Sequence, residues 1–324
     1  MRRSMIKNNS VSGTTANDHD DRGEGDGIVV YLSHNVDIEE NEVDYNDQAG
    51  IRITSDKPYG VQEDTTDITV DNNEVENNQY GVLVQDGVKG LSIIENTIDQ
   101  NEKGVYVEHS NDEDRGAEVA EITGNIISNN DQEGVLVEEW AKVYAIEDNE
   151  LEGNGSSDPG IDIHTIYPGN VNITGNIIGD SHNFGLYIRN IDDDAGAIKL
   201  SIEGNELKDN ETGMGFDSIK LSDGGSSLEV KENNYFDNNE DGLHFSENCV
   251  FEGIIDRIVI IRNRFEGNNR FGLNNLSGDE IDATENWWGA DDGPSGEGGG
   301  DAVSEDVLFD PWYMDKEMES LSSD

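Results

Sequence analysis

Two stretches of seventeen residues, ITVDNNEVENNQYGVLV at positions 68–84 and LSIIENTIDQNEKGVYV at positions 91–107, align with each other without a gap. Both follow one template, apolar-x-apolar-x-x-Asn-x-apolar-x-x-Asn, then two or more residues, and then Gly-apolar-x-apolar, where x is any residue. Residues 120–137 repeat this template with one insertion, and residues 200–216 repeat it again. A template that recurs in this way predicts a solenoid in which each repeat forms one coil.

The first asparagine of the template extends the repeat over almost the whole chain. Its copies are at least 23 residues apart, with insertions of up to 9 residues, which is how a solenoid accepts loops on a fixed coil. The column comprises Asn9, Asn41, Asn73, Asn96, Asn125, Asn149, Asn176, Asn205, Asn234, Asn263 and Asn286.

Within each repeat, apolar residues alternate with polar ones in three short runs, a pattern that predicts three strands per turn. Leucine-rich and helical solenoids are excluded, because no amphipathic helix of period 3.6 lies between the runs. The sequence therefore predicts an all-β fold, a parallel β-helix with three strands per turn and about ten coils. We expect each corner asparagine to adopt a left-handed backbone and to bond the asparagine one coil away.

The charge of the chain restricts the classes of partner that we expect it to bind. Asp and Glu number 72 against 20 Lys and Arg, which gives a net charge of −52. A field of this sign repels phosphate backbones and anionic lipids, so we expect neither nucleic acid nor membrane insertion. Self-repulsion is tolerated where salt is concentrated, because the screening length falls to about 3 Å at 1 M, and this indicates a halophile protein. Cys249 stands alone and predicts no disulfide, and no export signal or membrane-length apolar stretch is present in the chain as written.

The C-terminal part of the sequence carries a distinct set of motifs, Asn286-Trp287-Trp288-Gly289, Gly293-Pro294-Ser295-Gly296, Gly300-Asp301 and Asp310-Pro311-Trp312. Together with the repeat, these motifs resemble the NosD-like right-handed parallel β-helix repeat proteins, many of which come from the cell surfaces of haloarchaea and bacteria. The resemblance covers roughly residues 6–313. It implies right-handed coils and a cell-surface or extracellular location.

We expect three segments, with β-helix repeats over residues 1–286, an aromatic cap over 287–313 and a disordered acidic tail over 314–324. A cap would protect the unpaired strand edges of the last coil. A sugar-binding Trp287–Trp288 platform is the alternative interpretation of those side chains. No cap-like segment precedes Asn9, so we expect either that residue 1 lies within a longer gene, or that a second copy or another member of a larger assembly covers the N-terminal end. The residues expected to form the cap are Trp287, Trp288, Phe309 and Trp312.

The candidate binding face is the outer face of the strand that follows each Gly corner. In nine coils, beginning at Gly27 and ending at Gly242, the second and fourth residues after Gly point outward. Tyr, His and Arg occur there more often than their overall frequency predicts, whereas Asp and Glu do not. The alternative interpretation is a stabilising charge ladder on a solvated sheet. The predicted glycan-binding residues are Tyr106, Glu138, Asp162, His164, Tyr187, Arg189, Asp217 and His244.

Two functions are consistent with this face. The first is a non-catalytic glycan-recognising or structural rod, on a cell surface or in a virion spike or fibre, whose partner is a surface or extracellular polysaccharide or glycoprotein. The second is a polysaccharide lyase or epimerase acting on acidic polysaccharides. In that case Arg189 neutralises the substrate carboxylate and His164 or His244 abstracts the proton. Tyr187 then stacks on the sugar or donates a proton beside the space left by Gly215.

Several loops are rich in oxygen ligands, and none has the spacing of a defined calcium loop. We interpret them as solvated acidic loops, with structural Ca²⁺ or another cation as the alternative and no other cofactor. The candidate metal ligands are Asp192, Asp193 and Asp194, and the other acidic loops are Asp18–Asp21, Asn111–Asp114 and Asp291–Gly293.

Overall fold

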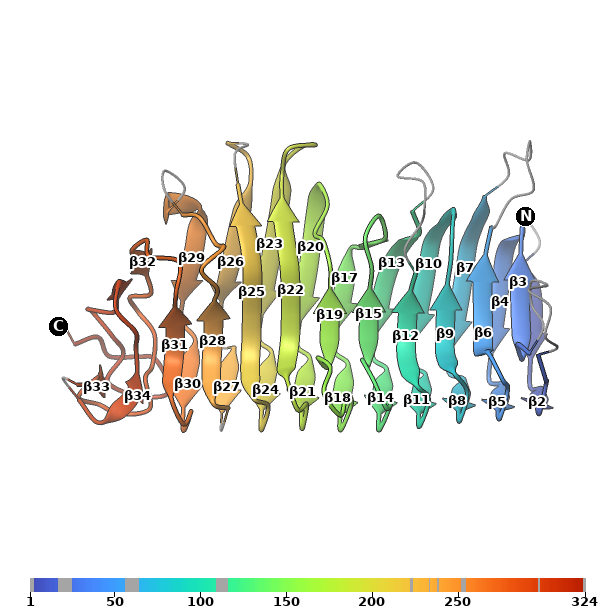
Figure 1. The fold of residues 1–324 in the computed structure, drawn as a ribbon, viewed down its shortest axis with the longest axis horizontal. Coiled ribbons are helices and arrows are strands. Elements are labelled where there is room, and N and C mark those ends of the chain that lie inside the picture. Colours follow the sequence, from blue (N-terminus) through green and yellow to red (C-terminus); the bar gives the residue numbers. More distant parts are fainter. Residues whose placement is uncertain are drawn as a thin grey trace. The chain divides into compact units, whose positions relative to one another are not determined.

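The computed structural model describes most of the chain, and Figure 1 shows its strands. By its internal contacts the chain divides into two units, residues 1–162 and residues 163–324. Each unit is an all-β parallel β-solenoid, which confirms the predicted fold class. The described residues are 3–16, 25–55, 64–108, 116–221, 224–232, 234–237, 239–251, 255–296 and 298–322.

Three parallel sheets form the sides of the first unit. The first sheet contains β1 (Ser4–Lys7), β4 (His34–Glu39), β7 (Thr65–Asp71), β10 (Val88–Ile94), β13 (Glu118–Thr123) and β17 (Ala145–Glu147), with β16 (Lys142–Val143) paired to β13. The second contains β2 (Ser10–Ser12), β5 (Glu42–Asp44), β8 (Glu74–Glu76), β11 (Thr97–Asp99), β14 (Ile126–Ser128) and β18 (Glu150–Glu152). The third contains β3 (Ile28–Tyr31), β6 (Ala49–Thr54), β9 (Tyr80–Val84), β12 (Lys103–Val107) and β15 (Val135–Val137), and β19 (Ile161–Ile163) spans the boundary between the units.

The second unit repeats this arrangement. Its first sheet contains β20 (Gly169–Thr174), β23 (Ile198–Glu203), β26 (Ser227–Lys231) and β29 (Ile258–Ile261), which follows the 3-10 helix η2 (Ile255–Arg257). Its second contains β21 (Ile177–Gly179), β24 (Glu206–Lys208), β27 (Tyr235–Asp237) and β30 (Arg264–Glu266), and its third contains β22 (Phe184–Asp192), β25 (Thr212–Lys220), β28 (Asp241–Phe245) and β31 (Phe271–Asn275).

The register of the strands places like residues above one another. Ile93 of β10 pairs with Val70 of β7, and Ile98 of β11 pairs with Val75 of β8. All four side chains are fully buried. The apolar positions of the template therefore form the core, and each coil extends the apolar stack of the coil before it.

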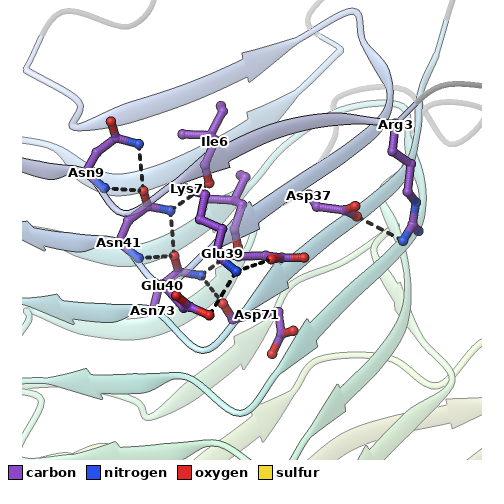
Figure 2. A network of polar contacts seen from close by, with 11 residues as sticks. Arg3, Ile6, Lys7, Asn9, Asp37, Glu39, Glu40, Asn41, Asp71 and Asn73 are labelled. Carbon is purple, nitrogen blue, oxygen red and sulfur yellow. Dashed lines mark hydrogen bonds and ion pairs between the residues drawn. The ribbon is translucent and has the colours of Figure 1, made fainter.

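An asparagine ladder holds the first corner of the coil, and Figure 2 shows its beginning. Asn9 donates from its backbone N–H and from Nδ2 to Oδ1 of Asn41, and Asn41 donates in the same way to Asn73, all at 2.9–3.0 Å. Nδ2 of Asn41 also donates to the carbonyl of Ile6 at 3.0 Å. The ladder thus satisfies buried backbone and side-chain groups together, as the sequence predicts.

The left-handed backbone at this corner belongs to a different residue from the one predicted. Positive φ occurs at the residue just before the ladder asparagine, for example at Glu40 (φ 51°), Asn72 (φ 53°) and Glu95 (φ 54°). These three side chains are exposed, whereas the ladder asparagines that follow them are buried. Asparagine therefore recurs because of its hydrogen bonds, while the strained position tolerates several residue types at a cost of about 1–2 kcal/mol.

The second corner carries a parallel ladder, and in the second unit this ladder ends in a carboxylate. Asn239 donates to Asn268 from its backbone and from Nδ2 (3.2 and 3.1 Å). Asn268 donates in turn to Asp301 of the cap from its backbone (3.1 Å) and from Nδ2 (2.6 Å). Because every rung donates towards the C-terminus, the last rung needs only an acceptor, and an aspartate supplies it.

The Gly before each third strand is required by close stacking. A Cβ on Gly81 would lie 2.6 Å from the carbonyl oxygen of Gly104 in the next coil and 2.5 Å from Ile98. Any larger residue at this corner would push two coils apart.

The C-terminal segment covers the end of the second unit with aromatic side chains. Trp288 is fully buried and stacks on Phe265 with 4.7 Å between ring centroids. Trp287 packs with Tyr313 and Met318, so the Trp pair is not available as a sugar platform. The described part of the segment expected to be a disordered tail folds back, because apolar Met318 and Leu321 pack against the cap. The short strands of this region are β32 (Ile281–Asp282), β33 (Pro294–Ser295), β34 (Gly300–Ala302) and β35 (Val307–Leu308).

Candidate functional site

On the first unit, outward side chains of the third sheet form a chain of hydrogen bonds. Arg52 donates from Nε and Nη2 to the carboxylate of Asp26 (2.6 and 3.0 Å) and from Nη1 to Gln85 (2.6 Å). Gln85 donates in turn to Glu108. The Asp26 side chain is fully buried, and only 14% of the Arg52 side chain is exposed. These contacts have the form of the stabilising ladder that the sequence analysis gave as its alternative interpretation.

Tyr106 and Glu138, two of the predicted glycan contacts, belong to this same face. The Tyr106 ring lies 5.3 Å from the Tyr80 ring, and its hydroxyl is hydrogen-bonded to Glu138. Burial, reinforced by the Glu138 carboxylate, raises the pKa of Tyr106 well above its ordinary value. Asp162 is fully buried, contrary to the outward exposure predicted for it. The predicted positions of this unit are therefore occupied by partnered or buried side chains.

On the second unit, aromatic side chains gather over β22 and β25. Phe184 stacks on Tyr187 with ring centroids 4.3 Å apart, and the guanidinium carbon of Arg189 lies 5.5 Å from the centre of the Tyr187 ring. Gly215 pairs with Tyr187 on one side and with His244 on the other. A Cβ on Gly215 would lie 2.3 Å from the Phe184 ring, so Phe184 fills the space that the sequence analysis left open there. We call Phe184, Tyr187 and His244 the aromatic shelf.

The other two predicted residues of this unit are placed differently. Asp217 accepts hydrogen bonds from Ser246 (3.1 Å) and from Nδ2 of Asn248 (3.1 Å), so its carboxylate holds the turn after β28. His164 directly follows β19 and is half-buried. Of the predicted residues, Tyr187 and His244 belong to the shelf and Arg189 lies beside it.

A cavity of about 880 Å³ lies beside His244. Part of its wall is β31, and part is the cap segment 303–306, which the Leu273–Val303 bridge and the bond from Ser304 N–H to the Leu273 carbonyl (3.1 Å) join to β31. His244 therefore belongs both to the aromatic shelf and to the cavity. The lining includes His244, Arg270, Asn274, Leu276, Glu305 and Asp306.

A buried carboxylate fixes the cationic side of this cavity. Asp241 accepts from Nε of Arg270 (2.8 Å), from Nη2 of the same guanidinium and from Nδ2 of Asn274 (2.8 Å). Nδ1 of His244 lies 3.6 Å from the same carboxylate. The Asp241 side chain is fully buried, whereas 51% of the Arg270 side chain is exposed. The guanidinium is thus held in a fixed position and still faces solvent.

The protonation state of Asp241 follows from these contacts. Burial alone would raise the pKa of Asp241, but the hydrogen bonds from Arg270 and Asn274, together with the nearby His244 imidazole, hold that pKa well below its ordinary range. Asp241 is therefore ionised at neutral pH. It neutralises Arg270 and cannot act as a general acid.

Sequence reasoning missed Arg270, Asn274 and Asp241, although a signal for them was present. The Gly column continues one coil further, to Gly272, and Asn274 is the second residue after that Gly. Asp241 directly precedes Gly242, just as Asp26 directly precedes Gly27. The positions just before the Gly corner therefore carry functional side chains, with Arg270 two residues before Gly272.

The predicted metal ligands Asp192, Asp193 and Asp194 lie close together, with one carboxylate oxygen of each within 4.8 Å of the others. Nζ of Lys220 pairs with Asp192 (3.6 Å) and Asp194 (2.7 Å), so an ammonium group already neutralises part of this cluster. The acidic loops Asp18–Asp21 and Asn111–Asp114 lie outside the described residues.

Comparison with known proteins supports this architecture. A family model of the right-handed β-helix region matches residues 1–114 and 113–287. The chain belongs to the right-handed β-helix family. The coils are therefore right-handed, as the resemblance implied. A search of curated proteins gave no match to this chain.

Solved structures of similar fold include two carbohydrate-active enzymes. The catalytic unit of a thermostable GH87 α-1,3-glucanase from Streptomyces thermodiastaticus strain HF3-3 is 12% identical, with 97% of this chain and 64% of that chain covered and a TM-score of 0.54. A mutant of the periplasmic alginate epimerase AlgG is 18% identical, with 61% of this chain and 46% of that chain covered and a TM-score of 0.49. The chain thus spans less than two thirds of the length of either protein. Among the described residues, no helix has the length and apolar character needed to cross a membrane.

Proposed function

We propose that this chain is a carbohydrate-binding protein whose glycan site is the cavity beside β28 and β31. One observation carries this proposal: Arg270, fixed by the buried Asp241 carboxylate, is half-exposed in a cavity that His244 links to the Phe184–Tyr187 stack. Sugars are held by apolar contact between their C–H faces and flat side chains, together with hydrogen bonds to hydroxyl groups. The aromatic shelf and the cavity supply both kinds of contact within one unit.

Binding without catalysis is the role that we propose for this site. Its buried carboxylate is held ionised by Arg270 and therefore has no proton to give. The Phe184 ring lies over Gly215, which separates Tyr187 from His244 in the register of the sheet. The two predicted acid–base partners are thus kept apart by an aromatic ring, whereas a lyase or epimerase needs both at one sugar carbon.

Affinity measurements on the full chain test this proposal. Calorimetric titration with a panel of soluble polysaccharides in concentrated salt is expected to identify at least one that binds. Asn274→Ala is expected to abolish that binding, because the variant removes a polar group from the cavity wall. Asp217→Ala is the matched control, since Asp217 belongs to the same sheet but lies outside the cavity lining. Failure of every polysaccharide to bind, or equal loss in both variants, would refute the proposal.

A lyase or epimerase acting on acidic polysaccharides is the second candidate, and one contact favours it. His244 Nδ1 lies 3.6 Å from Asp241, an arrangement that could orient the imidazole as a general base. Incubation with uronate polymers tests it, with absorbance of unsaturated uronate ends for the lyase and proton exchange at the sugar carbon for the epimerase. Activity that His244→Gln removes would support the enzyme, and no activity on a polymer that binds would reject it.

The NosD-like assignment, the halophile origin and the location on a cell surface or in a virion belong to the same proposal. The C-terminal motifs support the first, and the net charge of −52 supports the second. If the chain is adapted to salt, its circular dichroism spectrum is expected to lose β structure when salt is removed. Full stability in dilute buffer would contradict the halophile origin.

A further inference from the structure

The charge balance of the cavity indicates which sugars it accepts. Arg270 is its fixed cation, and both oxygens of the Asp241 carboxylate accept hydrogen bonds from that guanidinium. The pair is therefore close to neutral, and Arg270 offers hydrogen-bond donors without offering an uncompensated positive charge. An anionic ligand gains little Coulomb energy from such a pair.

The cap segment makes another part of the cavity wall acidic. Glu305 and Asp306 line it and both residues are exposed. Their segment is anchored to β31, because Oγ of Ser304 accepts from the Asn275 backbone N–H (2.7 Å) and the Asp306 carbonyl accepts from Nδ2 of Asn275 (3.1 Å). The two carboxylates therefore stand on a fixed wall and offer only acceptors.

Apolar surface is present in the same cavity. Leu276 is 54% exposed, and Phe271, beneath the Arg270 guanidinium at 5.9 Å, also lines the space. The loop that carries Leu276 is tied back to Asn275, whose Nδ2 donates to the Asp279 carbonyl at 2.8 Å. A flat C–H face of a sugar ring can rest on these side chains.

We propose that this cavity binds an uncharged sugar residue with adjacent hydroxyl groups, and that it discriminates against uronates. A hydroxyl group both donates and accepts, so the hydroxyl groups of one sugar can accept from Arg270 and donate to Glu305 or Asp306, which line the same cavity. A uronate carboxylate cannot donate, and it meets two like charges on the acidic wall and the net charge of −52 beyond it. This inference rests on the proposed function and names its ligand class.

Matched pairs of polysaccharides test the inference. Soluble glucan, galactan and mannan are each compared with the same polymer oxidised at C6 to the uronate, by calorimetric titration across a salt series. Within the pair that binds, the neutral member is expected to bind about tenfold tighter or more, and the preference is expected to persist in concentrated salt, where long-range repulsion is screened. Equal or tighter binding of the oxidised member would overturn the inference and leave the proposed function standing. Binding of neither member in any pair would defeat both.

Variants locate the source of the preference. The double substitution Glu305→Gln and Asp306→Asn keeps hydrogen-bonding groups and removes both charges, and asparagine tolerates the positive φ of residue 306 (59°). We expect it to improve binding of the oxidised polymer several-fold while the neutral polymer weakens less. The double substitution Glu317→Gln and Glu319→Gln, which removes two exposed charges outside the cavity, is the control for net charge alone. If this control changes the preference as much as the Glu305 and Asp306 variant does, the acidic wall is not its cause.

Discussion

Each unit contains an arginine whose guanidinium is held by a buried aspartate, and we call each such pair a clamp. The two clamps share this ion pair and differ in how far the arginine is exposed. In the first unit Asp26 holds Arg52, whose guanidinium also donates to Gln85 and is 14% exposed. In the second unit Asp241 holds Arg270, which lines a cavity and is 51% exposed. Both carboxylates are fully buried. Residue type therefore does not separate the structural ladder from the proposed binding site, whereas the two sites differ in the exposure of the cation.

Removal of the buried carboxylate is expected to give the largest difference in stability between the two clamps. Asp26→Ala leaves Arg52 buried without its anion, which costs about 3–5 kcal/mol of unfolding free energy. Asp241→Ala costs less, about 1–3 kcal/mol, because water can reach Arg270, although Asn274 loses its acceptor. Chemical denaturation of both variants in concentrated salt checks this order.

Glycan titration of the same two variants is expected to rank them the other way. The variant with the smaller stability loss, Asp241→Ala, loses binding, whereas Asp26→Ala keeps it. An equal stability loss in both variants, together with equal binding, would remove the distinction between the clamps.

The asparagine ladder is expected to respond alike in the two units, because it is common to both. Asn96→Ala removes the acceptor of the Asn73 backbone N–H and side chain (both 2.9 Å). Asn234→Ala does the same to Asn205 (3.1 and 2.9 Å). Each variant is expected to lose about 2–3 kcal/mol, since buried donors are left without partners. Denaturation midpoints measure both, and a loss confined to one unit would show that the ladder is not a shared frame.

Replacement of one aromatic side chain in each unit by alanine is expected to change glycan affinity in the second unit only. Tyr187→Ala removes the partner of Phe184 and is expected to weaken glycan binding about fivefold, within the range of about 0.5–1.5 kcal/mol for an aromatic contact. Tyr106→Ala, its counterpart on the first unit, is expected to leave affinity unchanged. A larger effect at Tyr106 would move the site to the first unit.

The pH dependence of stability gives the smallest effect. Replacing one carboxylate in each unit is expected to change stability with opposite signs. Burial raises the pKa of Glu108, so its ionised form costs stability as pH rises through the ordinary glutamate range towards the higher folded value. Glu108→Gln is therefore expected to stabilise the protein at neutral pH, and the gain is expected to vanish in acid.

Asp241, whose pKa is lowered, contributes stability above the ordinary aspartate range, and that contribution is lost as pH falls towards its lower folded value. Asp241→Asn is expected to destabilise at neutral pH and to approach the parent protein in acid. Denaturation midpoints at pH 2, pH 4 and pH 7, taken as the variant minus the parent, measure each sign. Asp241→Asn is expected to approach the parent only at pH 2 and Glu108→Gln already at pH 4, and equal signs at pH 7 would contradict the two shifts.

Sequence periodicity was sufficient to predict the fold. Apolar residues alternate with polar ones between the Asn and Gly columns, and this pattern specifies three strands per turn. Core stacking requires an apolar residue at the same position of every coil, and the ladder requires an asparagine at its own position. The left-handed position was assigned wrongly, since exposed residues as different as Glu95 and Arg262 occupy it and leave no compositional signal. The C-terminal segment was expected to be disordered from its acidity, although Met318 and Leu321 provide apolar contacts.

The site could be predicted only in part. Alternation places Tyr187 and His244 on the outer face, yet it cannot show that Asp162 is buried or that Phe184 covers Gly215. Arg270 directly precedes β31 and Asp241 is the first residue of β28, so both lie next to a corner, where side-chain direction depends on the turn and not on period two. Their place beside the Gly corner can be located in the sequence, but only the three-dimensional contacts show that the two side chains meet.

Hydrogen–deuterium exchange with a bound neutral polysaccharide tests most directly whether the glycan site lies on the second unit. We expect new protection in β28, in β31 with the loop after it, and in residues 303–306, with no change in β9 or β12. Protection that appears in β9 and β12 and is absent from the cavity segments would contradict the account.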